Sequence, residues 1–213
     1  MGIVREEMPR HSVIHTAATY EVRKYVPSVV AECSYGGEWG SGNDGSPFGA
    51  LARYIGVFGT PQNKRAEGSA SEAIAMTAPV LVSPATSSPE AIAMTAPVLV
   101  SAPKTAQHTM AFVLPASKYT AVEQAPQPTD PRVRLRQLPE RVQAVRSYTW
   151  SFTADRAKEN LAELLADLER DDWTVRRGED GEVEWQAAGY NPPFALPFMK
   201  RNEVLVSVEE KAS

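Results

Sequence analysis

The chain has 213 residues, of which 43% are hydrophobic and 23% are charged, as in globular proteins and unlike disordered ones. The 22 Lys and Arg against 26 Asp and Glu leave a formal net charge of −4, which argues against a nucleic-acid-binding protein, because those carry a basic surplus. The single cysteine excludes an intramolecular disulfide and a cysteine-rich zinc site, and it fits a reducing compartment. Seventeen prolines and 13 glycines argue against long helices, and no stretch is apolar enough for a helical membrane span.

The first residues do not have the pattern of a targeting sequence. They lack an apolar segment, and Glu6 and Glu7 come early, which argues against a secretory signal and against an organellar transit peptide. We therefore expect a cytoplasmic protein, with chloroplast association as the alternative. Residues 1–18 are expected to form an N-terminal segment, followed by a single domain over 19–209.

The first half of the domain predicts two strands and a short helix. Residues 20–35 predict strands on either side of Pro27, and apolar residues alternate along the second, as in a strand with one buried face. Residues 47–58 have apolar side chains at helical spacing, with Pro47 suited to the first turn and Gly56 suited to the end.

A duplication of 12 residues follows. EAIAMTAPVLVS occurs at 72–83 and again, identically, at 90–101. Two copies are too few for a solenoid, which needs at least three. Each copy predicts an extended segment interrupted at its proline, and a structural role is favoured over a catalytic role for the repeated Met-Thr pairs.

The second half repeats the order of the first. In chain order it predicts a strand at 109–114, a loop at 116–131, two strands around Pro139, a helix at 154–171 capped by Thr153, and a final strand at 203–208. In both halves two strands bracket a proline and precede a helix and a further strand. The fold class is therefore α+β, with one curved antiparallel sheet or open barrel and a helix packed in each half.

No catalytic constellation is apparent in the residues. The three histidines, His11, His15 and His108, have no zinc-ligand spacing, and the chain has no nucleophile elbow, no phosphate-binding loop and no dinucleotide-binding glycine motif. Cys33 lies on an apolar strand face, which favours a buried, unreactive thiol. We therefore favour a protein that is not an enzyme.

An apolar and aromatic loop near the end of the chain is a candidate site. Its large side chains and neighbouring cations are Tyr190, Phe194, Phe198, Met199, Lys200 and Arg201. Apolar surface beside cations suits a flat ligand with a hydrophobic body and carboxylates. The alternative is a loop that covers the core, with its two cations in solvent.

Several stretches resemble the SOUL/heme-binding protein family, most closely its plant and algal cytosolic-type members. They are YEVRKYVPSVVAE, LARYIGVFGTPQN, both AIAMTAPV copies, FVLP, AVEQAPQPTDPRV and AGYNPPFALPFMKRNEV, spread over about residues 19–208. The resemblance implies a distorted antiparallel β-barrel of two pseudo-repeated halves. It also implies non-covalent binding of heme or another porphyrin in a shallow apolar groove between the first helix and the YNPP-type loop.

Carried over by position, the resemblance implies a set of site residues. The helix side of the groove is Phe48, Leu51, Ala52 and Ile55, Arg53 meets a propionate, and Phe194, Phe198 and Met199 form the other wall. Relatives have further basic residues where this chain has its glycine-rich loop and Leu196, and Lys200 or Arg201 are expected to replace them. No histidine aligns with an axial ligand, so His11, His15 and His108 stay candidates for iron.

Three functions are compatible with these residues. The first is a tetrapyrrole carrier, buffer or sensor, with the tetrapyrrole as its partner and without nucleic acid or a membrane span. The second is an enzyme that modifies or degrades heme, because iron without a firm axial ligand is open to chemistry. The third is a protein-interaction module that uses the leucine stripe of helix 154–171, against which stands the simpler interpretation that this stripe packs on its own sheet.

Overall fold

The computed structural model describes residues 6–36, 46–65, 70–84, 107–191 and 195–211. In chain order the elements are β1 (His11–Thr16), β2 (Glu21–Tyr25), β3 (Ser28–Gly36), α1 (Pro47–Ile55), β4 (Asn63–Lys64), β5 (Val80–Ser83), β6 (Gln107–Val113), the 3₁₀ turn η1 (Val122–Gln124), β7 (Gln127–Pro128), β8 (Val133–Leu138), β9 (Arg141–Tyr148), α2 (Ala154–Arg170), β10 (Trp185–Gly189), the 3₁₀ turn η2 (Pro197–Met199) and β11 (Asn202–Ser207). None of the helices in these ranges is long and apolar enough to cross a membrane.

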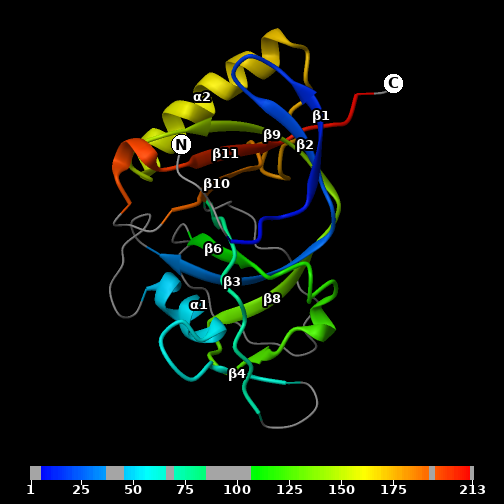
Figure 1. Cartoon of the computed structure of the whole chain (residues 1–213). Helices are drawn as coiled ribbons and strands as arrows, with labels where there is room; N and C mark the ends of the chain where they lie inside the picture. Colours follow the sequence, from blue (N-terminus) through cyan, green and yellow to red (C-terminus); the bar gives the residue numbers. More distant parts are fainter. Residues whose placement is uncertain (1–5, 37–45, 66–69, 85–106, 192–194, 212–213) are drawn as a thin grey trace.

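Nine of these strands form one antiparallel sheet. Their order is β1-β2-β9-β11-β10-β5-β6-β3-β8, and β4 and β7 form a separate small ladder. The sheet curls into a half-barrel, with α2 above it and α1 below it in Figure 1. This confirms the predicted α+β class, a distorted antiparallel barrel with two packed helices.

Two prolines make the corner of the half-barrel. Strand β2 runs beside β9 as far as the pair Tyr25–Arg141, and β3 runs beside β8 from the pair Ser28–Leu138. Pro27 and Pro139 lie between these ladders. Because proline has no backbone N–H to donate, the ladder is interrupted there and the two strands turn together. The paired prolines of the sequence thus mark one structural bend.

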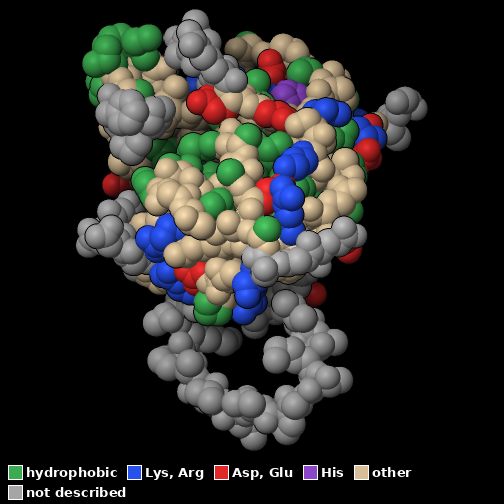
Figure 2. Space-filling view, turned by 60° about the horizontal axis from the view of Figure 1, so that its bottom comes forward, with side chains coloured by type: hydrophobic (Ala, Val, Ile, Leu, Met, Phe, Trp, Pro, Cys, Tyr) green, Lys and Arg blue, Asp and Glu red, His purple; other side chains and the backbone are tan. Residues whose placement is uncertain are grey.

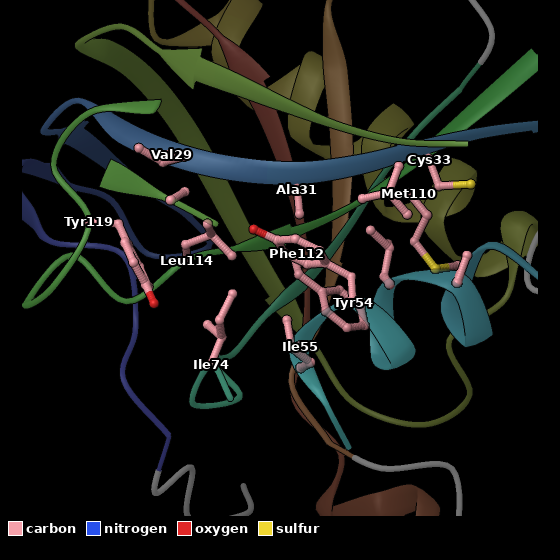
Figure 3. Packing of buried hydrophobic residues seen from close by; sticks show 14 of the residues in the cluster. Val29, Ala31, Cys33, Tyr54, Ile55, Ile74, Met110, Phe112, Leu114 and Tyr119 are labelled. Atoms are coloured by element: carbon pink, nitrogen blue, oxygen red, sulfur yellow. The ribbon is translucent and has the colours of Figure 1, made fainter. Parts of the chain in front are cut away.

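The helices cover the outer face of the sheet and divide the core. Helix α1 packs on β3, β6 and β8, and α2 packs on β9 and β11. Beneath α1, the even residues of β6 and the odd residues of β3 meet the helix, and Phe112 lies at the centre of this cluster in Figure 3. A third cluster, which includes Val30, Val145 and Leu205, fills the inside of the half-barrel.

Helix α2 follows the prediction closely. The Thr153 hydroxyl accepts a hydrogen bond from the Arg156 N–H at 3.4 Å, as expected of an N-cap. Ala157, Leu164 and Leu168 have no exposed surface and pack against the sheet. The leucine stripe considered for partner binding is therefore used by the protein's own core.

The first copy of the duplicated sequence is structural. Ile74 is buried beneath α1, and Thr77 Oγ1 donates to the Val113 carbonyl. The second half of this copy forms β5, which lies between β6 and β10. The second copy, 90–101, lies outside the described residues.

The structure differs from the prediction at strands that carry little pattern. Strand β1 was not expected, since all six of its residues are exposed and no apolar alternation indicates a strand. Strand β7 lies within the predicted loop 116–131 and pairs with β4. Helix α1 ends at Ile55, and Gly56 caps it in the left-handed conformation as its place in the sequence predicted, so only the last residues of the predicted range 47–58 lie outside the helix.

Candidate functional site

Helix α1, the first predicted wall of the groove, is fixed at both ends by its own sequence. Ser46 Oγ accepts a hydrogen bond from the Gly49 N–H at 3.1 Å, and Pro47 occupies the first turn, where no donor is needed. At the other end Gly56 has a φ of 91°, which glycine adopts without strain, and its N–H donates to the Ala52 carbonyl. The helix is therefore held in one position against the sheet.

The predicted groove residues of α1 differ in their exposure. Leu51 and Ala52 have no exposed surface, and Ile55 is 3% exposed. Phe48 is half-buried and packs edge-on against Phe112, with the ring centroids 5.4 Å apart. Leu51 and Ile55 therefore pack in the protein's own core beneath the helix, whereas Phe48 retains surface that a ligand could contact.

Arg53 is the cation that the prediction assigns to a propionate. It is half-buried, and its guanidinium reaches back along the helix, since a Cβ added at Gly49 would lie 3.5 Å from Nη1. The Arg132 hydrogen bond is the main cause that lowers the pKa of nearby Asp130, and Arg53 adds a smaller effect. Within the described ranges the Arg53 guanidinium has no hydrogen bond or ion pair, so a carboxylate could bind it.

The loop between β10 and β11 carries the second predicted wall. Its turn η2 begins at Pro197 and is closed by N–H donors from Met199 and Lys200. Leu196 is 55% exposed, Phe198 58% and Met199 43%. Figure 2 shows hydrophobic side chains on the surface at its upper left, on the side where this loop lies in Figure 1. Large apolar side chains gathered in solvent mark a binding surface more often than scattered ones do.

The two cations beside η2 differ in what they contact. The Arg201 guanidinium lies 4.4 Å from the centroid of the Tyr190 ring and donates to Glu203 at 2.6 Å. Lys200 is half-buried at the end of the turn. Arg201 is thus engaged in an internal ion pair, and Phe194, the remaining residue of the predicted wall, lies outside the described residues.

Trp150 is an exposed aromatic residue of this surface that the sequence did not indicate. It is 52% exposed and lies in the turn between β9 and α2. Its backbone N–H donates to the Pro197 carbonyl at 2.9 Å, which places it against the η2 turn. The signal in the sequence was weak, because 46 residues separate the two positions and an aromatic residue before a helix cap is ordinary.

Phe152 connects the neighbourhoods of the two predicted walls. It is half-buried and packs against both the cluster beneath α1 and the cluster beneath α2. A Cβ added at Gly189, at the end of β10, would lie 3.4 Å from its ring. In Figure 1 the η2 loop lies at the upper left, near α2, and helix α1 lies at the lower left. The segment 150–152 therefore lies between the helix cluster and the loop.

The three histidines lie on two separate strands of the sheet. His11 and His15 are on the edge strand β1, at the right of Figure 1, and the His15 ring is tilted against that of Trp173, with the centroids 5.6 Å apart. His108 is on β6, on the face covered by α1, with its ring 5.6 Å from that of Tyr35. Among the described residues no group of three or more His, Cys, Asp or Glu side chains could hold a metal ion.

A buried charge network stabilises the base of the η2 loop. The Glu203 carboxylate has no exposed surface and accepts hydrogen bonds from Arg23 at 3.1 and 3.2 Å, Arg201, Ser147 at 3.1 Å and Tyr190 at 2.5 Å. Burial alone would raise the pKa of Glu203, but the two arginines outweigh it and hold that pKa below its ordinary value. Burial and the neighbouring carboxylate raise the pKa of Tyr190, which therefore stays a neutral donor.

Two hollows of the described surface lie away from the predicted site. One, of about 10 Å³, lies between the N-terminal segment at Met8 and the sheet at Ser28. The other, an open groove of about 360 Å³, lies between α2 at Leu165 and the segment from Trp173 to Arg177. Neither contains a residue of the predicted heme site.

The chain is similar to one protein family in sequence and to several solved structures in fold. A family model described as SOUL heme-binding protein matches residues 6–207. No curated protein matches the chain. Similar solved structures include a hydrolase from Listeria innocua, with 11% identity, a TM-score of 0.53 and coverage of 90% of this chain and 92% of that one. The C-terminal domain of EcmrR has 7% identity, a TM-score of 0.54 and coverage of 96% and 100%. At these identities the structures share the fold alone.

Proposed function

The chain belongs to the SOUL heme-binding protein family, and from this premise we propose that it binds heme or a related tetrapyrrole non-covalently, as a carrier, buffer or sensor. The proposed site is the surface formed by the outer side of α1 and the η2 loop. We place this activity in the cytoplasm, with chloroplast association as the alternative, and propose that no nucleic acid takes part.

The observation that carries the location of the site is the exposed apolar surface of the η2 loop. A tetrapyrrole has a flat apolar body, and removing Phe198, Met199 and Leu196 from water against it is favourable. Because Phe198 is already partly buried, its contribution is about 1 kcal/mol, or about fivefold in Kd.

The charge arrangement supports the choice of a ligand with carboxylates. Arg53 has no ion pair within the described residues, and its guanidinium can donate two hydrogen bonds to a propionate. Arg201 is held by Glu203, so Arg53 is the better candidate for this contact. The described residues thus fit the chemistry of the group, and bound heme would supply a redox-active iron.

The proposal is tested by titrating the protein with hemin and following the Soret band. We expect a saturable shift, and Phe198→Ala is expected to weaken binding about fivefold. Arg53→Ala is expected to weaken it about threefold, since the pair is partly exposed to water. Arg134→Ala, at an exposed residue of β8, is the control for loss of one positive charge.

A second ligand separates the two contributions. The dimethyl ester of protoporphyrin has no carboxylates, so Arg53→Ala should leave its affinity unchanged while Phe198→Ala still weakens it. Absence of saturable binding of any of these ligands to the wild-type protein would overturn the proposal.

A further inference from the structure

The backbone of Trp150 has an unusual conformation. Its φ is 77°, in the left-handed region that glycine adopts freely and that side chains with a Cβ avoid. A large aromatic residue at such a position costs free energy that glycine or asparagine would not. Strained residues of this kind are concentrated at binding and catalytic sites, so the observation points to a function of the side chain.

Packing does not account for this tryptophan. It is 52% exposed, and the buried clusters beneath the two helices include Phe152 but not Trp150. A residue retained for stability would be expected to bury its ring. The indole therefore contributes surface to the outside of the molecule and little to the core.

The backbone around Trp150 is held at both of its polar groups. Its N–H donates to the Pro197 carbonyl, and its carbonyl accepts from Asn202 Nδ2, each at 2.9 Å. Asn202 is itself 2% exposed and begins β11, so the anchor is rigid. These bonds fix the strained residue beside Leu196 and Phe198. An aromatic surface fixed in advance loses little conformational freedom when a ligand binds.

We propose that Trp150 is a binding residue of the tetrapyrrole site and stacks on the face of the macrocycle, an inference that rests on the proposed function. The exposed side chains here include two aromatic rings, which prefer flat π-systems as partners. The segment 150–152 also contacts both the buried cluster beneath α1, through Phe152, and the η2 loop, through the Trp150 N–H. A ligand that contacts both walls would therefore lie beside this segment. Trp150 then recognises the macrocycle and not the metal, so porphyrins with and without iron should bind with similar affinity.

The test uses the left-handed conformation to separate binding from folding. Trp150→Gly removes the indole and also the strain, so its unfolding midpoint in urea should be no lower than that of the wild type. Its affinity for hemin and for iron-free protoporphyrin should fall by at least about fivefold, as expected for a lost stacking partner. Trp150→Phe, which keeps an aromatic ring, should retain most of the affinity. Val13→Ala, at an exposed residue of β1, should change neither quantity.

Fluorescence gives an independent readout. Iron-free protoporphyrin quenches tryptophans near it, and the fraction of emission quenched at saturation should fall in Trp150→Phe although binding persists. Wild-type binding with unchanged affinity in Trp150→Gly would overturn this inference and leave the proposed function standing. If the wild-type protein were a dimer that dissociated in Trp150→Gly with unchanged porphyrin affinity, the exposed surface around Trp150 would serve self-association. That result would also overturn this inference. Absence of binding to the wild type would instead overturn the proposed function.

Discussion

Replacing Glu203 with glutamine should destabilise the fold strongly. The carboxylate has no exposed surface and is the buried counter-charge of Arg23 and Arg201. Glutamine has a similar shape but no charge, and its amide presents donors toward the donating arginines. Breaking a buried pair by removing one partner costs about 3–5 kcal/mol, because the other charge remains buried. This is a large part of the roughly 5–15 kcal/mol by which a domain is stable.

Urea unfolding at pH 7 measures this loss, with an unchanged denaturant slope as the sign that the folded state is intact. Glu21→Gln is the matched control, since Glu21 pairs with the same Arg23 but its side chain is 39% exposed. The control should lose less than about 1 kcal/mol. If Glu203→Gln lost no more stability than the control, the ion pairs of Glu203 with Arg23 and Arg201 would be irrelevant to stability and our reasoning would be wrong.

Two further predictions concern the α1 half and the α2 half. The pKa of Glu72 is lowered to about 2, first by its hydrogen bond from Lys118 and then by those from Tyr119 and Arg65. Its contribution, about 1–2 kcal/mol after screening by solvent, is present above the ordinary value of 4.5 and is lost as the pH falls toward 2. Glu72→Gln should therefore flatten the acid limb of stability against pH, and an unaltered limb would contradict the assignment. Leu164→Ala, at a fully buried residue of α2, should cost about 2–5 kcal/mol in urea unfolding. The control is Leu196→Ala, at an exposed residue, which should cost less than about 0.5 kcal/mol; equal losses in the two variants would refute the packing of the leucine stripe.

Residue patterns predicted those strands and helices whose conformation depends on residues close together in the sequence. Alternation along 28–36, the proline at the start of α1 and the threonine cap of α2 each act within a few residues. Strand β1 was missed because its pairing with β2 decides its conformation and its own side chains are exposed. A strand whose faces are both in water carries no hydrophobic period.

The candidate site was less predictable, because periodicity does not say which neighbour an apolar side chain meets. Leu51 and Ile55 have the spacing of a buried helix face, and both belong to the cluster between that helix and the sheet. Arg201 was predicted to meet a ligand, and in the structure its guanidinium donates to the carboxylate of Glu203, two residues further along the chain. Trp150 depends on a backbone angle and on a hydrogen bond to a distant carbonyl, neither of which a sequence displays.

Amide hydrogen exchange of the wild-type protein with and without hemin tests the location of the site most directly. We predict slower exchange on binding in peptides that cover 47–58, 149–152 and 195–201. Peptides from the open groove at 165–177 should exchange at the same rate in both states. Protection confined to that groove or to β1, or no protection at saturating hemin, would contradict the proposed site.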